Sequence, residues 1–298
     1  MGWSHTRRRS TLPPVSPRDA VIASIGELSV TPRVIRHLSR FLQSPDEDMS
    51  DAIEALKAEP VLTAAILAAC NAPYQYRGGK VLDLESAVHR IGYRETYRIA
   101  LLVTFRQGLR LPNLPDNAAA DCLWRRAAIA ACAMEQLTVE VHAQAAAYTT
   151  GLLHLIGCFI LARSRQCTAA LDPAHPSVAA RAQMEQCSIA YPEAGAIALE
   201  KWGFPPQITV PIRRQLEPVV AGEHGPAAAL LTRAAGVALE IEASRPGSPM
   251  FSVETAMREP DELTRSVETA STELLNAFHP GAVRRPAWAD RPLKPVQV

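Results

Sequence analysis

One histidine, His154, lies in the middle of the apolar run GLLHLIGCFIL, which spans residues 151–161. An imidazole in such a setting has two common roles. It is either a metal ligand, which needs further His, Asp or Glu side chains around it, or a core side chain that makes one hydrogen bond. The run supplies no other His, Asp or Glu, so a metal site would require partners from elsewhere in the chain.

Two pairs of adjacent arginines could bind an anion, because a guanidinium group holds a phosphate or a carboxylate through two parallel hydrogen bonds. The pairs are Arg125-Arg126 and Arg213-Arg214. The alternative is that these side chains form ordinary ion pairs at helix ends, with Glu193 and Glu217 nearby in the same segments. We favour the ion pairs. An anion pocket predicts that Arg126→Ala abolishes nucleotide binding in calorimetry, whereas equal heats would exclude it.

The six cysteines are scattered, and none belongs to a CxxC pair. This pattern is typical of buried, reduced thiols in a cytosolic protein rather than of disulfides or a zinc cluster. Nothing near Cys158 would lower the pKa of its thiol, so we do not expect a nucleophile there. Trp124 and Trp202 lie in apolar helical segments, which favours packing over base stacking.

Lysine and arginine total 31 against 30 for aspartate and glutamate, which gives a net charge of +1. Such a balance produces no long-range field that would concentrate nucleic acid or an anionic membrane surface. We expect the basic N-terminus, residues 1–11, to be flexible and solvated. No long apolar stretch follows it, and the apolar runs look too short to span a bilayer, so the sequence predicts a cytoplasmic protein without membrane insertion.

The elements that position these side chains are predicted to be helices. Alanine is abundant, apolar residues recur at spacings of three and four, and β-branched alternation is nearly absent, so we expect an all-α fold. Ser16-Pro17 and Thr31-Pro32 mark two helix starts. The predicted helices cover about 17–28, 32–43, 50–58, 61–70, 84–91, 94–108, 118–137, 141–165, 177–189, 192–202, 206–216, 226–244 and 261–278. A break near 111–117 is the best internal boundary.

Five segments occur in a distinctive order: LPPVSPRDAVIASIGEL, EPVLTAAILAACNAPYQYRGGKVLDLESAVHRIG, LWRRAAIAACAMEQL, GLLHLIGCFIL and YPEAGAIALEKWGFPPQITVPIRRQLEP. Their order resembles the HD-related output domain, HDOD, a bacterial signalling module that is itself similar to HD metal-dependent phosphohydrolases. The resemblance implies a compact multi-helix bundle, with an N-terminal helical subdomain at 12–110 and an HD-like core at 117–245. Composition adds a C-terminal helical extension at 250–278 and a disordered tail at 279–298.

The resemblance also implies where a metal site would lie. HD phosphohydrolases bind metal through a histidine on one helix, a His-Asp pair on the next, and further His or Asp side chains downstream. The histidine of the pair falls at His154, but Leu155 stands where the Asp would be, and an alkyl group coordinates nothing. The remaining ligand positions fall at about Arg126, Tyr191, Gln215 and Leu216. We therefore expect no catalytic residue, metal or cofactor, and a structural His154 that is buried and hydrogen-bonded.

These expectations favour a non-catalytic signal-transduction or regulatory module that acts through protein-protein interaction. The resemblance implies a partner that is another signalling protein, from a two-component or cyclic-dinucleotide pathway, and the groove between the two subdomains is the expected contact surface. Binding of a nucleotide in the relic pocket remains an alternative. One alternative is a divergent phosphohydrolase of nucleotides or cyclic dinucleotides, which needs four or more metal ligands. The other is a nucleic-acid-binding regulator, which needs a basic face.

Overall fold

The structure is a computed structural model, and helices are its regular elements in the part of the chain that it describes. The described residues are 16–25, 50–71, 79–108, 118–164, 167, 175–218, 221–248, 250, 252, 254–255 and 260–278. Among them no strand occurs, so the predicted all-α class is confirmed. The predictions for residues 1–11, 32–43, 111–117 and 279–298 lie outside these ranges.

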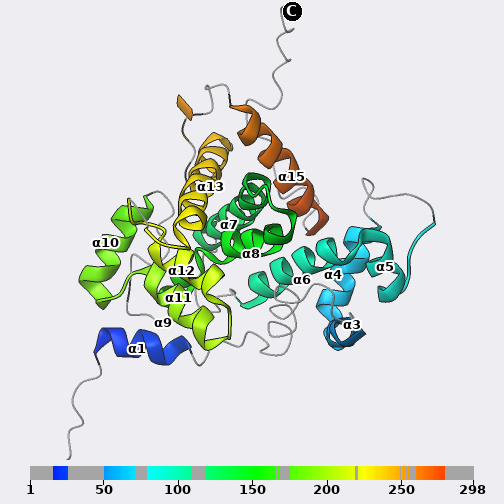
Figure 1. The fold of residues 1–298 in the computed structure, drawn as a ribbon, viewed down its shortest axis with the longest axis horizontal. Helices are drawn as coiled ribbons and strands as arrows, with labels where there is room; N and C mark the ends of the chain where they lie inside the picture. Colours follow the sequence, from blue (N-terminus) through cyan, green and yellow to red (C-terminus); the bar gives the residue numbers. More distant parts are fainter. Residues whose placement is uncertain are drawn as a thin grey trace, which may run out of the picture.

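The helices follow the predicted order (Figure 1). They are α1 (Pro17–Ser24), α3 (Ser50–Lys57), α4 (Pro60–Cys70), α5 (Leu84–Ile91), α6 (Tyr93–Gly108), α7 (Ala118–Leu137), α8 (Gln144–Leu153), α9 (Ile156–Ser164), α10 (Pro176–Cys187), α11 (Tyr191–Lys201), α12 (Pro206–Arg214), α13 (Gly225–Ser244) and α15 (Glu262–Phe278), with a short 3₁₀ turn η3 (Val141–Ala143) before α8.

Local sequence signals explain where several helices begin and end. Ser16 caps α1, because its hydroxyl oxygen accepts a hydrogen bond from the backbone N–H of Asp19 at 3.1 Å. Asn71 ends α4, and its side-chain amide also bonds the carbonyl and the N–H of Val81 at 2.8 and 2.9 Å. Gly92 separates α5 from α6 with φ of +82°, a conformation that L side chains rarely adopt.

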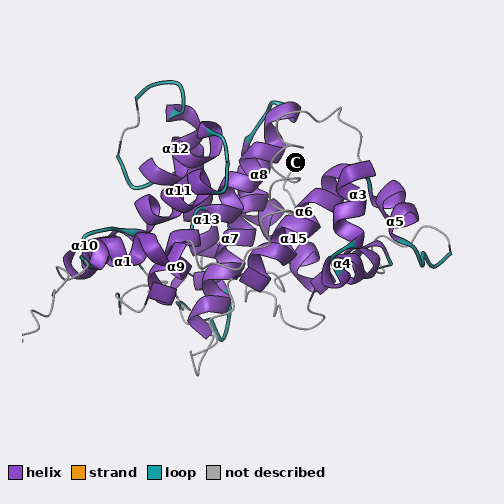
Figure 2. Ribbon diagram, turned by 90° about the horizontal axis from the view of Figure 1, so that it is seen from below, coloured by secondary structure: helices purple, strands orange, loops and turns teal. Residues whose placement is uncertain are grey.

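The helices form two groups. Helices α3 to α6 pack on one another at one end of the molecule, and α7 to α13 form the larger core (Figures 1 and 2). Although α1 falls within residues 12–110, it packs on α9, α10 and α11 of the core rather than on α3 to α6. An ion pair of 2.6 Å between Arg18 and Glu193 fixes it there. Helix α15 lies against α7, α4 and α13.

Polar contacts join the two groups at α6. Arg98 forms ion pairs with Glu95 at 2.9 Å and with Glu135 of α7 at 2.7 Å, and its guanidinium lies 4.9 Å from the ring centroid of Tyr148 on α8. The hydroxyl groups of Tyr97 and Thr149 are hydrogen-bonded at 2.5 Å. The junction is therefore fixed by buried polar groups as well as by apolar packing.

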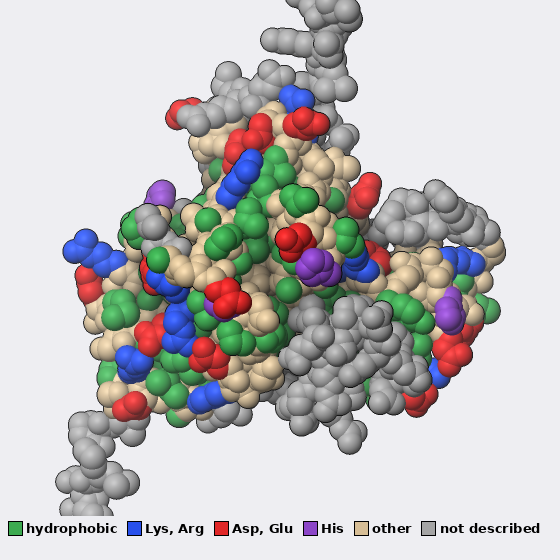
Figure 3. Space-filling model, in the orientation of Figure 1, with side chains coloured by type: hydrophobic (Ala, Val, Ile, Leu, Met, Phe, Trp, Pro, Cys, Tyr) green, Lys and Arg blue, Asp and Glu red, His purple; other side chains and the backbone are tan. Residues whose placement is uncertain are grey.

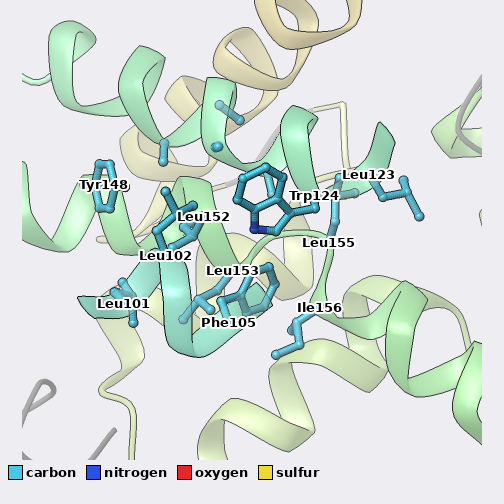
Figure 4. Packing of buried hydrophobic residues seen from close by; sticks show 14 of the residues in the cluster. Leu101, Leu102, Phe105, Leu123, Trp124, Tyr148, Leu152, Leu153, Leu155 and Ile156 are labelled. Atoms are coloured by element: carbon cyan, nitrogen blue, oxygen red, sulfur yellow. The ribbon is translucent and has the colours of Figure 1, made fainter. Parts of the chain in front are cut away.

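The core centres on α7, whose alanine-rich surface lets neighbouring helices approach closely. The α-carbon of Gly151 on α8 lies so near α7 that an added Cβ would come 2.6 Å from the carbonyl oxygen of Ala130. On α9, a Cβ at Gly157 would clash with the carbonyl oxygen of Tyr191. Larger side chains such as Trp124 and Phe105 fill the adjoining apolar layer (Figure 4).

The predicted continuous helix over 141–165 is broken in the structure. α8 ends at Leu153 and α9 begins at Ile156, so that the break falls on His154 and Leu155. The physical reason is a distant contact: the side-chain amide of Gln215 donates to the carbonyl oxygen of His154 at 3.0 Å and replaces a helical hydrogen bond there.

The segment Val141–Ser164 also corrects an expectation about apolar length. By length and composition it could cross a membrane, whereas the sequence suggested that every apolar run was too short. In the structure, 83% of its most apolar window is buried inside the protein, where α8 packs on α7 and α9 packs on α11. The core of the protein thus accounts for its apolar character.

Candidate functional site

All six positions assigned to the relic metal site meet at one pocket of about 150 Å³. They are Arg126 from α7, His154 and Leu155 from the break between α8 and α9, Tyr191 from α11, and Gln215 and Leu216 from the end of α12. Helix α13 forms the rim with Leu231, Thr232, Ala235, Gly236 and Leu239. We call this space the inner pocket. The six positions therefore lie together in the fold, while their history as a metal site stays a prediction.

His154 is a buried, hydrogen-bonded side chain, as expected. It is 1% exposed, and its Nδ1 lies 2.6 Å from the carbonyl oxygen of Gly151. Because a carbonyl only accepts, Nδ1 carries the proton and Nε2 is left as an acceptor. Burial lowers the pKa of His154 to about 4, and the positive charge of Arg126 also lowers it. The imidazole is therefore neutral at physiological pH.

Arg126 brings a positive charge to the floor of the inner pocket. Only 2% of this residue is exposed. Burial lowers the pKa of its guanidinium, although nearby thiol, phenol and carboxyl groups oppose that effect. An arginine keeps its proton even so. A cation in this position repels a metal ion, and it attracts an anion.

Gln215 has a structural role at a position that the resemblance assigned to a metal ligand. Its side-chain amide donates to the carbonyl oxygens of His154 at 3.0 Å and Ile212 at 2.8 Å. The backbone carbonyl oxygen of Gln215 accepts a hydrogen bond from the hydroxyl of Thr232 at 3.1 Å. The residue thus connects the break before α9 with α12 and α13, and its donors are already used.

Tyr191 supplies a protonated phenol to the inner pocket. The residue is 1% exposed, and its backbone N–H donates to the side-chain oxygen of Gln183 at 2.8 Å. Burial raises the pKa of the Tyr191 hydroxyl far above its ordinary value. The group therefore stays neutral and is no general base.

Three of the four arginines considered for anion binding are held in ion pairs. Arg125 makes two 3.1 Å hydrogen bonds to Glu242 of α13, a fully buried carboxylate. Arg214 pairs with the expected Glu217 at 2.7 Å. Arg213 pairs with Glu200 at 2.7 Å, while the suggested partner Glu193 is bound to Arg18. None of the three lines the inner pocket, so the anion-binding hypothesis continues for Arg126 alone.

Glu242 is the centre of a buried charge cluster that the sequence did not reveal. Besides Arg125, it lies 3.5 Å from Arg245 and accepts a 3.1 Å hydrogen bond from Ser248. Burial opposes ionisation, but the hydrogen bonds from Arg125 and the charge of Arg245 outweigh it and hold the pKa of Glu242 below its ordinary value. The cluster ties α13 to α7 behind the inner pocket.

The side chains at the inner pocket do not fit a metal ion. His154 is the one metal-ligand type among the described lining residues, and Leu155 presents only an alkyl group beside it. Across the described ranges, no three or more His, Cys, Asp or Glu side chains lie close enough to share an ion. A divalent cation needs several such donors, and the charge of Arg126 opposes it further.

The thiols and tryptophans singled out in the sequence belong to the core or pack against it. All six cysteines are buried and free, and burial raises the pKa of Cys158 to about 12, so it is no nucleophile at neutral pH. Trp124 is 6% exposed, and the guanidinium of Arg106 lies 4.6 Å from its ring centroid. Trp202 is partly buried against the core.

A second hollow adjoins the inner pocket, and the sequence did not predict it. It has a volume of about 640 Å³ and lies between the end of α12 and the start of α13, with Glu217, Pro218, Pro226 and Ala229 among its lining residues. Gln215, Leu216 and Thr232 border both hollows. We call it the outer groove. The groove expected between the two subdomains stays a prediction.

Comparison with known proteins gives one family and several similar structures. The HDOD domain model matches residues 28–218. A proposed phosphohydrolase from Shewanella amazonensis is 20% identical, with 87% of this chain and 98% of that chain covered and a TM-score of 0.63. A proposed signal transduction protein from Marinobacter aquaeolei is 21% identical over 87% of this chain, with a TM-score of 0.57, and this chain covers only 66% of its length.

An HDOD domain protein from Geobacter sulfurreducens is 16% identical, with 90% of this chain and 92% of that chain covered and a TM-score of 0.57. At these identities the three structures show a shared fold alone. No curated protein matches this chain.

Proposed function

This chain belongs to the HDOD family, and from that premise we propose that it is a non-catalytic module of bacterial signal transduction that acts by binding another signalling protein. The partner we propose is a component of a two-component or cyclic-dinucleotide pathway. We also place the module in the cytoplasm, because its six cysteines are free thiols.

The observation that supports a non-catalytic role is the composition of the inner pocket. Hydrolysis of a phosphoester by an HD enzyme needs a metal-bound water, and a metal needs several carboxylate or imidazole ligands. Leu155 and Arg126 occupy two of the expected ligand positions. At a third, the side-chain amide of Gln215 already donates hydrogen bonds to backbone carbonyls. These side chains support a pocket that does not hold a catalytic metal.

The main alternative is a phosphohydrolase, which two similar structures carry in their names. Metal content and hydrolysis of bis-p-nitrophenyl phosphate with added Mn²⁺ test it, with His154→Ala as the matched control. We expect both proteins to hold far less than one metal per chain and to hydrolyse at the same background rate. Stoichiometric metal in the unmodified chain together with hydrolysis that His154→Ala removes would overturn the proposal.

A partner protein can be tested by chemical cross-linking in cells followed by mass spectrometry. We expect one signalling protein to be captured repeatedly, with its cross-links confined to one face of this chain. Recovery of the purified pair at a fixed stoichiometry would support the proposal. Cross-links spread evenly over unrelated proteins would contradict it.

No observation favours a nucleic-acid-binding regulator. On the face shown in Figure 3, positive and negative side chains are interspersed over α11 and α12, and the net charge is only +1. Phosphate backbones are bound by clustered arginines and lysines. We therefore expect no salt-dependent retardation of DNA in a gel.

A further inference from the structure

Two buried polar atoms at the inner pocket have hydrogen-bonding capacity that the described part of the chain does not use. His154 and Tyr191 both line the pocket, and each is 1% exposed. The His154 ring bonds the carbonyl oxygen of Gly151 through Nδ1, and its Nε2 bonds no described residue. Tyr191 donates through its backbone N–H, whereas its phenol hydroxyl bonds none of the described residues. Buried polar groups are nearly always hydrogen-bonded, so these two atoms point to a ligand.

The two atoms are complementary to a hydroxyl group. Nε2 of His154 is an acceptor, because Nδ1 carries the ring proton. The hydroxyl of Tyr191 can donate, because burial raises the pKa of the phenol and the proton is kept. One ligand hydroxyl can donate its proton to Nε2 and accept from the phenol at the same oxygen. A carboxylate or an ether has no proton to donate to Nε2.

A charged head group is disfavoured at this floor. Burial of an ion costs far more than burial of a hydroxyl, unless a partner of opposite sign is available to it. Arg126 also lines the pocket, but it interacts with other groups of the chain, and the charge of Glu242 acts on it. The positive charge of Arg126 is felt at His154, whose pKa it lowers, so an ammonium head group would be repelled there. A neutral head group therefore fits the floor best.

Volume and polarity limit the rest of the ligand. The inner pocket, at about 150 Å³, is smaller than the roughly 300–1,000 Å³ that is usual for pockets enclosing an organic ligand, so only one end of a ligand enters it. The outer groove, at about 640 Å³, shares with it Leu216, which is 40% exposed. Pro218, Pro226 and Ala229 add further apolar surface to the groove. A ligand with a small polar end and an apolar chain matches both hollows.

We propose that the inner pocket and the outer groove bind a primary alkanol. Its hydroxyl donates to Nε2 of His154 and accepts from the hydroxyl of Tyr191, and its alkyl chain passes Leu216 into the groove. This goes beyond the proposed function, because it gives the module a small-molecule input. It is tested on the purified chain without a partner or a metal, so failure here leaves the cross-linking and metal experiments unaffected.

The first experiment measures dissociation constants by ligand-observed NMR of the full chain with propan-1-ol, pentan-1-ol and heptan-1-ol. Affinity should rise by about fourfold per methylene, the fold-change for burying about 0.8 kcal/mol of apolar group. The controls, 1-methoxybutane and pentanoate, are close to pentan-1-ol in length, but neither can donate a hydrogen bond to Nε2 of His154. Both should bind at least tenfold more weakly than pentan-1-ol. Equal or tighter binding of either control, or no dependence on chain length, would overturn the proposal.

The second experiment locates the site with two matched variants. Tyr191→Phe removes one hydroxyl and keeps the ring, and it should weaken pentan-1-ol at least fivefold. The control is Tyr148→Phe, because Tyr148 is also fully buried, lines neither hollow, and has a hydroxyl without a hydrogen bond to any described residue. It should bind pentan-1-ol like the unmodified chain. Unchanged binding in folded Tyr191→Phe, or equal losses in the two variants, would overturn the assignment.

A third variant narrows the rim and does not touch the buried floor. An added Cβ at Gly236 meets no atom within 4 Å, so α13 accepts a side chain there, and Gly236→Leu narrows the entrance to the inner pocket. We expect it to fold and to bind pentan-1-ol at least tenfold more weakly. Unchanged binding in folded Gly236→Leu would place the hydroxyl elsewhere and overturn the proposal, even if Tyr191→Phe does not fold.

Discussion

The side-chain amide of Gln215 donates a 3.0 Å hydrogen bond to the backbone carbonyl of His154, 61 residues earlier in the chain. This bond holds the end of α12 against the break between α8 and α9. The resemblance assigned both positions to the relic metal site. In the structure they are linked directly by a protein contact that connects these helices.

Removal of that contact should destabilise the fold. Gln215→Leu keeps the approximate volume but leaves the buried carbonyls of His154 and Ile212 without their donor. We expect the free energy of unfolding to fall by about 1–3 kcal/mol in urea titrations. The control is Gln207→Leu, at an exposed position of the same helix, which should change it by less than about 0.5 kcal/mol. Equal effects would show that Gln215 is not structural.

The stability of the protein should depend on pH through His154. Its pKa is about 4 in the folded state and 6.5 in the unfolded state, so between these values the unfolded chain binds more protons. The free energy of unfolding should therefore fall as the pH is lowered from 6.5 to 4, by about 3 kcal/mol from this group, and level off below.

Urea titrations at several pH values can measure that slope. The slope between pH 4 and 6.5 should be smaller in His154→Gln, which cannot titrate. It should be retained in His142→Gln, which alters an exposed histidine with 82% of its side chain accessible. A slope that is identical in all three proteins would refute the assignment to His154.

Two glycines on different helices should respond in opposite directions to alanine. At Gly157 the new Cβ would clash with the carbonyl oxygen of Tyr191, so α9 and α11 must separate, and we expect the free energy of unfolding to fall by about 1–3 kcal/mol or more. At Gly236 it meets open space within α13, and the better helix propensity of alanine should add about 0.5–1 kcal/mol. Thermal unfolding of both variants checks the pair, and shifts of the same sign would contradict it.

Neutralising Glu242 should be among the most damaging single changes. Glu242→Gln leaves the charges of Arg125 and Arg245 buried without their carboxylate, and breaking such a buried pair costs about 3–5 kcal/mol. Glu240→Gln, two residues earlier on α13, is the control and should have little effect. Chemical unfolding followed by circular dichroism would distinguish them, and a small loss at Glu242 would show that the cluster contributes little.

The sequence predicted what local signals encode. Ser16 before α1, Pro17 at its first position and Gly92 between α5 and α6 mark helix boundaries through their own local chemistry, and the structure has those boundaries. The positions of the relic site followed from the order of segments, and the structure brings them to one pocket.

Contacts between distant residues were not predictable in this way. The break at His154 depends on Gln215, and the apolar spacing of the run continues through it without a signal. Arg125 pairs with Glu242, 117 residues away, whereas sequence proximity suggested nearer carboxylates. The contribution of α13 to the pocket rim was equally hidden, because its apolar face looks like that of any packed helix.

Helix α15 contacts α4 in one group of helices and α7 and α13 in the other. It therefore connects the two groups of helices. A molecule that bound at the rim and tilted α13 would displace α15 and disturb the packing of α4, although it did not contact the group α3 to α6. Binding at the small inner pocket would in this way affect the packing of helices at the opposite end of the protein.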